Sequence, residues 1–171
     1  MRVGVLTISD RTARGERPDT SGPLLCDRAR ALEWEVVRAQ VVADDQDVIE
    51  SILIEWADGG GIDLVLTTGG TGVAARDRTP EATQRVIERS VPGLAEGMRA
   101  AGLTVTPHAM LSRGIAGIRR QCLIVNLPGN PRAAQESLAV IEPALPHAVS
   151  LLQGAPDAES GHRRKPKPQR A

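Results

Sequence analysis

Lysine is nearly absent from this sequence of 171 residues, because the only two, Lys165 and Lys167, lie close to the C-terminus. A P-loop needs a lysine to reach phosphate, and a Schiff-base enzyme needs one to attack a carbonyl group. The rest of the chain therefore fits neither class, and it does not fit a lysine-based dehydrogenase. Arginine has to supply the positive charge at any site that this part of the chain forms.

Aromatic residues are also scarce, since the chain has no tyrosine, no phenylalanine and only Trp34 and Trp56. Proteins that bind single-stranded nucleic acid stack the bases on several aromatic rings. The net charge is zero; from Gly154 onward there are five Lys/Arg and two acids, which leaves 16 minus 19, or −3, for the rest. Such a body does not suit a polyanion, and we expect no nucleic-acid partner.

Long apolar runs are missing too, and none approaches the roughly 20 residues that a membrane span requires. The N-terminal stretch MRVGVLTISD fits a first strand better than a secretion signal. We therefore expect a cytoplasmic protein with no membrane partner. Cys26 and Cys122 lie far apart, each in an apolar stretch and without CxxC spacing, and are predicted to be buried free thiols.

Apolar runs alternate with segments of helical spacing. The runs VGVLTI, EVVRAQVV, DLVLTT and CLIVNL predict strands over 3–8, 35–42, 63–68 and 122–127, mostly buried on both faces. Apolar stripes predict helices over 25–32 and 48–56, and first-turn prolines predict helix starts at Pro80, Pro92, Pro131 and Pro143. The stretch 103–120 stays open, with a short strand followed by a loop as one interpretation.

Strands that alternate with helices of this length favour right-handed βαβ crossovers. We predict an α/β fold of three layers, in which a mostly parallel sheet carries helices on both faces. The length and the apolar content suit a single domain, over residues 1–153. Residues 154–171 have three prolines and no apolar residue able to anchor a helix, so we expect a disordered basic tail.

Four loops follow the predicted strands at their carboxyl ends, where an open parallel sheet binds its ligands. They are SDRTARG (9–15), ADDQD (43–47), TTGGTGVAARD (67–77) and PGNP (128–131). In the third loop, backbone N–H groups at the glycines and the hydroxyls of Thr68 and Thr71 suit the oxygens of a phosphate chain. The loop fits neither GxGxxG nor GxxxxGK[ST], and a tight glycine turn without a ligand explains it equally well.

Asp44 and Asp77 are predicted to end neighbouring elements, where the pair is able to hold a Mg²⁺ ion together with phosphate oxygens and water. Each has a purely structural alternative. Asp44 or Asp45 is able to cap the helix that follows. Asp77 is less suited to capping, because Thr79, directly before the proline that starts the next helix, is predicted to be the cap.

Arginines accompany these loops. Arg11 and Arg113 are the best suited to clamp a phosphate, because hydroxyl groups and loop glycines accompany both. Arg76 and Arg78 flank Asp77 and are further candidates. A solvated surface position is the structural alternative for all four.

Two remaining features carry less functional information. No pair of histidines has the spacing of metal ligands, so none is assigned to a metal or to catalysis. In PGNP, Asn130 is able to cap the helix that opens at Pro131, which explains the turn without a ligand.

Six stretches resemble, in their order and spacing, a known family: ISDR, LVLTTGGTG, RDRTPEAT, PGLAEGMR, LSRGIAGIR and LIVNLPGNP. It is the MoaB/Mog family of molybdopterin adenylyltransferases, which includes the N-terminal domain of gephyrin. The resemblance covers residues 1–153 and implies an α/β fold, a homotrimer and a reaction in which Mg-ATP adenylylates the terminal phosphate of molybdopterin, releasing pyrophosphate. The product is then the substrate for molybdenum insertion, which implies an insertase as a further partner.

The resemblance also implies roles for single residues. The acidic pair of the active members corresponds to Asp44 and Asp77, as catalytic residues and as ligands of Mg²⁺. The nucleotide-contacting turns correspond to Gly69, Gly70, Thr71, Gly72, Pro128, Gly129 and Asn130. The pterin side corresponds to Ser9, Asp10, Arg11, Ser112 and Arg113. The presence of both aspartates favours an active enzyme.

Two alternatives stay open. Some proteins of this fold have lost the activity, so a silent molybdopterin-binding module or a scaffold is the second hypothesis, and pyrophosphate release distinguishes it from the enzyme. The basic residues near the C-terminus are able to bind nucleic acid or an acidic membrane, although such ends are more often solvated.

Overall fold

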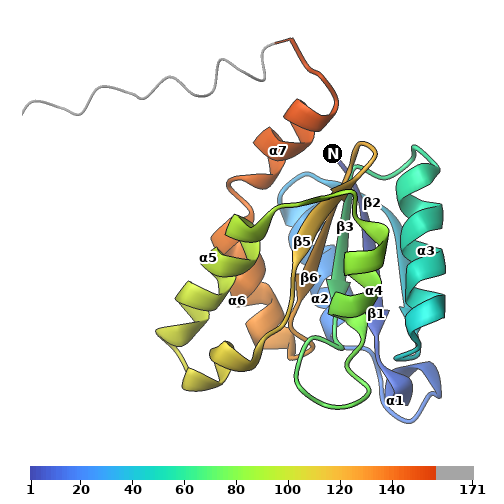
Figure 1. Ribbon diagram of the computed structural model, residues 1–171, viewed down its shortest axis with the longest axis vertical. Coiled ribbons are helices and arrows are strands. Elements are labelled where there is room, and N and C mark those ends of the chain that lie inside the picture. The colour runs from blue at the N-terminus through green and yellow to red at the C-terminus, as the bar shows by residue number, and fades with distance from the viewer. Residues whose placement is uncertain (157–171) are drawn as a thin grey trace, which may run out of the picture.

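Six strands form one sheet between two layers of helices in the computed structural model, which describes residues 1–156 (Figure 1). The sheet has the order β2-β1-β3-β6-β5-β4. The strands are β1 (Arg2–Ile8), β2 (Glu35–Val42), β3 (Leu64–Thr68), β4 (Arg89–Ser90), β5 (Ala116–Arg119) and β6 (Cys122–Leu127). β2, β1, β3 and β6 run parallel, and β5 is antiparallel to both of its neighbours. The predicted three-layer α/β fold is confirmed.

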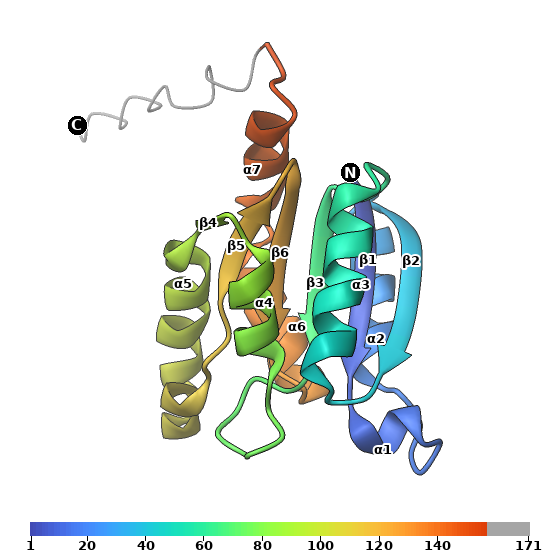
Figure 2. The same cartoon turned by 45° about the vertical axis from the view of Figure 1, so that its right-hand side comes forward.

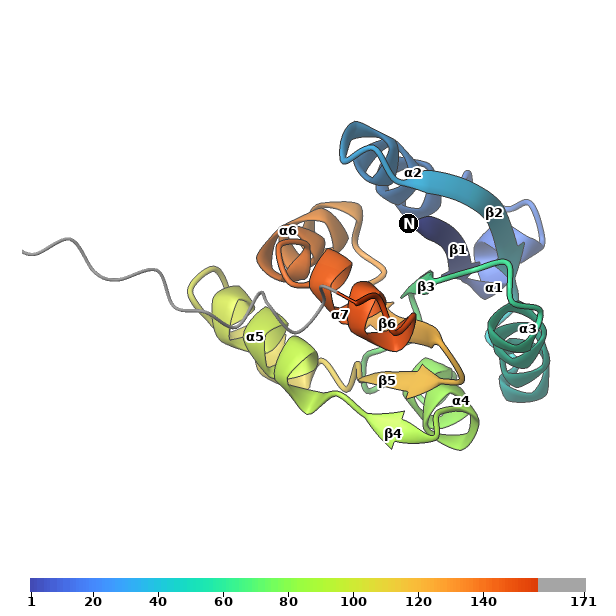
Figure 3. The ribbon, with the colours of Figure 1, turned by 90° about the horizontal axis from the view of Figure 1, so that it is seen from above.

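Seven α-helices and one 3₁₀ helix lie within the described residues. They are α1 (Asp10–Ala13), α2 (Ser21–Ala31), α3 (Gln46–Asp58), α4 (Thr79–Val86), α5 (Pro92–Leu103), η1 (Pro107–Leu111), α6 (Pro131–Ile141) and α7 (Leu145–Leu152). Seen from above, α3 and α4 lie on one face of the sheet, and α2, α5, α6 and α7 lie on the other (Figure 3).

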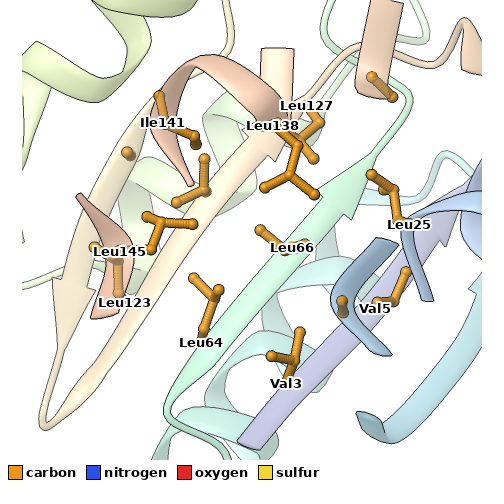
Figure 4. Close-up of a cluster of buried hydrophobic side chains, with 14 of the residues drawn as sticks. Val3, Val5, Leu25, Leu64, Leu66, Leu123, Leu127, Leu138, Ile141 and Leu145 are labelled. Atoms are coloured by element: carbon orange, nitrogen blue, oxygen red, sulfur yellow. The ribbon is translucent and has the colours of Figure 1, made fainter. Parts of the chain in front are cut away.

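The alternation of apolar residues along β1 builds a core on each face of the sheet. Val3 and Val5 belong to the larger core, beneath α2, α6 and α7, which Figure 4 shows in close-up. Leu6 and Ile8 belong to the smaller core, beneath α3 and α4. Burying a side chain of this size contributes about 1.5–3 kcal/mol, so the two cores fix the sheet whose edge carries the four loops.

The prediction that the strands are mostly buried on both faces holds for β1, β3 and β6 and is wrong for β2. Most of its residues are exposed, because β2 is the last strand of the sheet and pairs only with β1. The short edge strand β4 was not predicted, since two residues carry no periodic signal. Cys26 and Cys122 are buried and free, as predicted.

Helix starts agree with the prolines at 80, 92 and 131 but not at Pro143, where the prediction is wrong. The chain from Glu142 to Ala144 forms a turn after α6, and α7 begins at Leu145 with Pro146 in its first turn. Both prolines tolerate a helix start because neither has an N–H group to lose, so the sequence alone does not choose between them.

The open stretch 103–120, for which a short strand followed by a loop was one interpretation, contains instead a 3₁₀ helix followed by a strand. Thr106 accepts a hydrogen bond from the N–H of His108 and opens the 3₁₀ helix η1, and the strand β5 follows it. β5 forms a hairpin with β6, and Arg120 adopts φ +53 at the turn between them. Of the predicted tail, residues 157–171 lie outside the described part of the chain.

Candidate active site

The loops that follow the parallel strands meet at one end of the sheet, as predicted. The segment from β1 into α1 and the loop from β3 into α4 lie side by side at the bottom of Figure 2. Ten predicted site residues line a polar pocket of about 610 Å³: Ser9, Asp10, Arg11, Asp44, Thr68, Gly69, Gly70, Asp77, Gly129 and Asn130. Thr71, Gly72, Ser112 and Pro128 line a second pocket, which shares Gly70, Asp77, Gly129 and Asn130 with the first.

Gly69 brings the end of β3 close to its neighbours. Its φ is +104, and a Cβ at this position would collide with the carbonyl oxygen of Ile8. On the other side a Cβ at Gly129 would lie 3.1 Å from the Cα of Gly69. Only glycine permits this conformation and this close approach, so the predicted tight glycine turn is present. The same turn places the backbone of the loop at the wall of the polar pocket.

The two threonines of the glycine loop (residues 67–77) that were predicted to donate to phosphate, Thr68 and Thr71, differ in whether their hydroxyls are available. Thr68 donates its hydroxyl hydrogen to the carbonyl oxygen of Pro128 at 2.7 Å, so this hydrogen is committed to the fold. The prediction is wrong for Thr68. Thr71 lines the second pocket, and its hydroxyl makes no hydrogen bond within residues 1–156.

Asp45, not Asp44, caps the helix α3, because its carboxylate accepts the N–H groups of Asp47 and Val48. Asp44 instead accepts the N–H of Asp10 at 2.8 Å, and Asp10 accepts the N–H of Asp44 at 3.1 Å. Burial raises the pKa of the Asp44 carboxyl, and the neighbouring Asp10 and Asp77 raise this pKa further. Burial therefore disfavours the charge of this carboxylate, while the hydrogen bond from the N–H of Asp10 acts in the opposite direction.

Asp77 faces the same space from the opposite loop. Its Oδ2 accepts the N–H of Ala74 at 2.8 Å, which closes a turn before α4. The prediction that Thr79 caps this helix is wrong: Thr79 is its first residue, and its hydroxyl donates to the carbonyl oxygen of Gly69 at 2.9 Å. Neither Asp44 nor Asp77 is therefore explained by helix capping.

The donor set at this edge suits Mg²⁺ only in part. A Cβ at Gly70 would lie 3.1 Å from Oδ1 of Asp44, and a Cβ at Gly72 would lie 2.9 Å from Oδ2 of Asp77, so the glycines leave both carboxylates uncovered. Within residues 1–156, no three His, Cys, Asp or Glu side chains converge as a metal site. Two carboxylates fit a Mg²⁺ ion that takes its other ligands from phosphate oxygens and water.

Arg76 ties the glycine loop to α1. Its guanidinium makes two hydrogen bonds to Asp10, Nε to Oδ2 at 2.9 Å and Nη2 to Oδ1 at 2.8 Å. These bonds lower the pKa of the Asp10 carboxyl, and the charge of Arg76 also acts to lower the pKa of Asp44. From the sequence, Arg76 was a candidate phosphate clamp. Its ion pair with Asp10 was not predicted, because a local sequence pattern does not indicate a partner 66 residues away.

Arg113 does not present its guanidinium to a ligand, so its predicted role as a phosphate clamp is contradicted. Nε donates to the carbonyl oxygen of Gly72 and Nη2 to that of Asp77, both at 2.6 Å. Nη1 pairs with the carboxylate of Glu81, whose pKa this hydrogen bond lowers. Arg113 therefore holds the glycine loop by bonds separate from those of Arg76, and it fixes the backbone of Asp77.

The second pocket, of about 760 Å³, is mostly apolar and lies between α5, η1 and α6. Met98, Ala109, Leu111 and Val140 are among the apolar residues that line it. Arg99 borders it as well and donates to the carbonyl oxygen of Gly114 at 2.9 Å, which holds the loop before β5. A pocket of this size and character suits a planar ring system.

Asn130 caps α6, as predicted, by accepting the N–H of Ala133 at 3.1 Å. It also lines both pockets, so the structural and the functional interpretations of PGNP are compatible. In the part of the chain that the structure describes, no helix has the length and apolar character needed to cross a bilayer.

Comparison with known proteins gives consistent results. The family model described as a probable molybdopterin binding domain matches residues 4–147. The chain is 43% identical over 159 residues to a molybdopterin adenylyltransferase of Helicobacter pylori strain J99. The aligned region covers 90% of this chain and 89% of that protein. It is 40% identical over 175 residues to gephyrin of Dictyostelium discoideum, covering 95% of this chain and 24% of gephyrin.

Solved structures agree with the sequence comparisons. The molybdopterin biosynthesis enzyme MoaB of Thermus thermophilus superposes with a TM-score of 0.85 at 52% identity, over 90% of this chain and 96% of that one. At 52% identity the two chains are alike in sequence as well as in fold.

Proposed function

Because this chain belongs to the family of probable molybdopterin-binding domains, we propose that it is an enzyme that transfers the adenylyl group of ATP to molybdopterin. Pyrophosphate is released, and the adenylylated pterin enters molybdenum cofactor biosynthesis. The relative from Helicobacter pylori carries this activity in its name. The observation that carries the proposal is the pair Asp44 and Asp77, which lines the polar pocket although neither residue caps a helix.

The two pockets support a reaction between two substrates. Molybdopterin and ATP each combine a planar heterocycle with phosphate, and the site combines an apolar pocket with a polar one. Gly70, Asp77, Gly129 and Asn130 belong to both pockets. We place the phosphorus that is transferred at this shared boundary, where backbone N–H groups and the acidic pair are within reach.

The transfer requires positioning and charge neutralisation more than proton transfer. An oxygen of the pterin phosphate attacks the α-phosphorus of ATP, a new P–O bond forms, and the bond to the β-phosphate breaks as pyrophosphate leaves. The attacking phosphate monoester is already ionised, so no strong base is needed. Asp44 and Asp77 would hold Mg²⁺, which neutralises phosphate charge when bound. Gly69 and Gly70 bring the backbone close enough to orient the phosphates.

We infer that the protein works in the cytoplasm as a homotrimer and passes its product to a molybdenum insertase. Apolar side chains in the turn after α5 and on η1 support self-association, since Val105 is 62% exposed and Met110 68% exposed. Surfaces of this kind mark protein contacts. Sedimentation of the purified chain tests the trimer.

The test of the activity is an incubation of the purified protein with molybdopterin and Mg-ATP, followed by chromatography of the pterin and an assay of pyrophosphate. We expect adenylylated pterin and pyrophosphate in equal amounts. Retention of bound pterin with no product would assign the protein to the silent binding modules of the same fold.

A further inference from the structure

The segment that follows β1 folds back on itself and carries three arginines to the polar pocket. Ser9 caps α1 by accepting the N–H of Thr12, and the N–H of Glu16 donates to the carbonyl oxygen of Arg11 at 2.9 Å. Gly15 permits this reversal because it adopts φ +72. Arg11, Arg14 and Arg17 all line the pocket as a result. Sequence reasoning missed Arg14 and Arg17, because the reversal at Gly15 leaves no periodic pattern.

The three arginines differ in whether their charge is available. Arg14 is neutralised by Glu16, through bonds of 2.6 Å from Nε and 3.1 Å from Nη2. Within the described residues, Arg17 donates only to the hydroxyl of Thr12, which in turn donates to the hydroxyl of Ser9. The side chain of Arg11 makes no hydrogen bond and no ion pair among residues 1–156. Arg11 and Arg17 therefore present positive charge to the pocket without a carboxylate bound to either guanidinium.

A nucleotide bound in this pocket would bring the negative charge of its phosphates, and positively charged side chains are needed to balance it. Asp44 and Asp77 together carry enough negative charge to cancel one bound Mg²⁺ ion, which leaves the charge of a polyphosphate chain without compensation. Arg76 is already paired with Asp10, and Arg113 is occupied by the glycine loop and Glu81. The described part of the chain contains no lysine. Among the described residues, Arg11 and Arg17 are the cations that line this pocket and form no ion pair.

We propose that Arg11 and Arg17 form the site that holds the β- and γ-phosphates of ATP and the pyrophosphate that leaves. The proposal rests on the adenylyl transfer proposed above, and it adds a place for the leaving group. It assigns Arg11 to ATP, whereas the family resemblance placed Arg11 on the pterin side. The guanidinium of each arginine is able to bind two phosphate oxygens at once. The polar pocket, of about 610 Å³, has room for this chain of phosphates beside the acidic pair.

The test is calorimetric titration of the full chain with Mg-pyrophosphate, which needs no turnover. We expect Arg11→Gln and Arg17→Gln each to weaken binding at least about tenfold, because each removes a charged hydrogen-bond donor. Arg30→Gln is the matched control, since it removes the same charge at an exposed position outside the pocket that is paired with Asp27. The Michaelis constant for ATP should rise with Arg11→Gln and Arg17→Gln, and that for molybdopterin should not.

Unchanged pyrophosphate affinity in the double variant Arg11→Gln/Arg17→Gln would overturn the proposal, and so would an equal loss of affinity in Arg30→Gln. An increase in the Michaelis constant for molybdopterin alone would overturn it too, by assigning the arginines to the phosphate of the pterin. These results are distinct from failure of the proposed activity, which shows as a wild-type protein that makes no adenylylated pterin. Circular dichroism of each variant separates loss of the site from loss of the fold.

Discussion

Asp10 and Asp44, 34 residues apart in the sequence, hold each other by a reciprocal pair of hydrogen bonds. Each carboxylate accepts the backbone N–H of the other residue, so the end of β1 and the end of β2 are joined at the polar pocket. Two neighbouring carboxylates repel each other, and Arg76 offsets the repulsion by binding Asp10. The position of Asp44 thus depends on a residue of the glycine loop.

The first prediction concerns the ion pair between Arg76 and Asp10. Arg76→Gln should lower the adenylylation rate by about tenfold to 100-fold, because small displacements of a positioned group have effects of this size. Stability should change by less than about 1 kcal/mol, since the Arg76 side chain is 65% exposed. The double variant Asp10→Asn/Arg76→Gln should be no slower than the slower single variant. Additive losses would show that the two residues act separately.

The second prediction concerns Arg113, which holds Gly72, Asp77 and Glu81 at once. Arg113→Lys keeps the charge but lacks the planar group that reaches three partners, so we expect a large loss of turnover, about 100-fold. Arg89→Lys, at an exposed position of β4, is the control and should behave as wild type. Full activity of Arg113→Lys would mean that charge alone suffices there.

The third prediction concerns the glycine turn. Gly69→Ala should lower the free energy of unfolding by more than about 2 kcal/mol, because a positive φ costs about 1–2 kcal/mol and the collision with Ile8 adds to it. Gly61→Ala has nothing within 4 Å of the added carbon and should stay within about 0.5 kcal/mol of wild type. Chemical denaturation measures both. Equal stabilities would show that the turn relaxes freely.

The fourth prediction concerns Asp63, at the end of the sheet opposite the site. Burial would raise the pKa of its carboxyl, but hydrogen bonds from the guanidinium and the N–H of Arg2 lower it. Because the folded pKa lies below the unfolded value of about 3.9, the ionised group stabilises the fold above that pH. Its contribution is lost as the pH falls through the folded pKa.

Asp63→Asn tests this account by measurement of unfolding from pH 7 to pH 3. The variant should be less stable at pH 7 by about 1–3 kcal/mol, and the difference from wild type should shrink as the pH falls. Gln153 also donates to Asp63, at 2.9 Å, so the same bond network anchors the end of α7. A difference that stays constant with pH would contradict the ionic role of Asp63.

Much of the fold follows from the sequence because its signals are local. The four parallel strands are short apolar runs, and proline marks the first turn of α4, α5 and α6. The exposure of β2 could not be predicted, since its sequence does not say that it is the last strand. The prediction also failed at α7, because Pro143 and Pro146 lie three residues apart and give the same helix-start signal.

The candidate site was predictable in its location and less so in its contacts. Parallel strands bring their carboxyl ends together, so the convergence of Asp44, Asp77 and Asn130 follows from topology. The partners of Arg76 and Arg113 depend on how two loops pack, and neither loop has a repeating pattern. Arg113 was predicted to bind a ligand because hydroxyl groups and loop glycines accompany it, whereas it binds the backbone of the glycine loop.

The central claim is that Asp77 and Asp44 form a metal-dependent adenylyl-transfer site. The most direct measurement compares pterin adenylylation by wild type, Asp77→Asn and the exposed-surface control Asp47→Asn under the same Mg-ATP concentration. The account predicts product from wild type and from Asp47→Asn, and none from an Asp77→Asn protein whose circular dichroism is unchanged. Near-normal turnover by Asp77→Asn would contradict it and would leave the glycine loop as a docking turn.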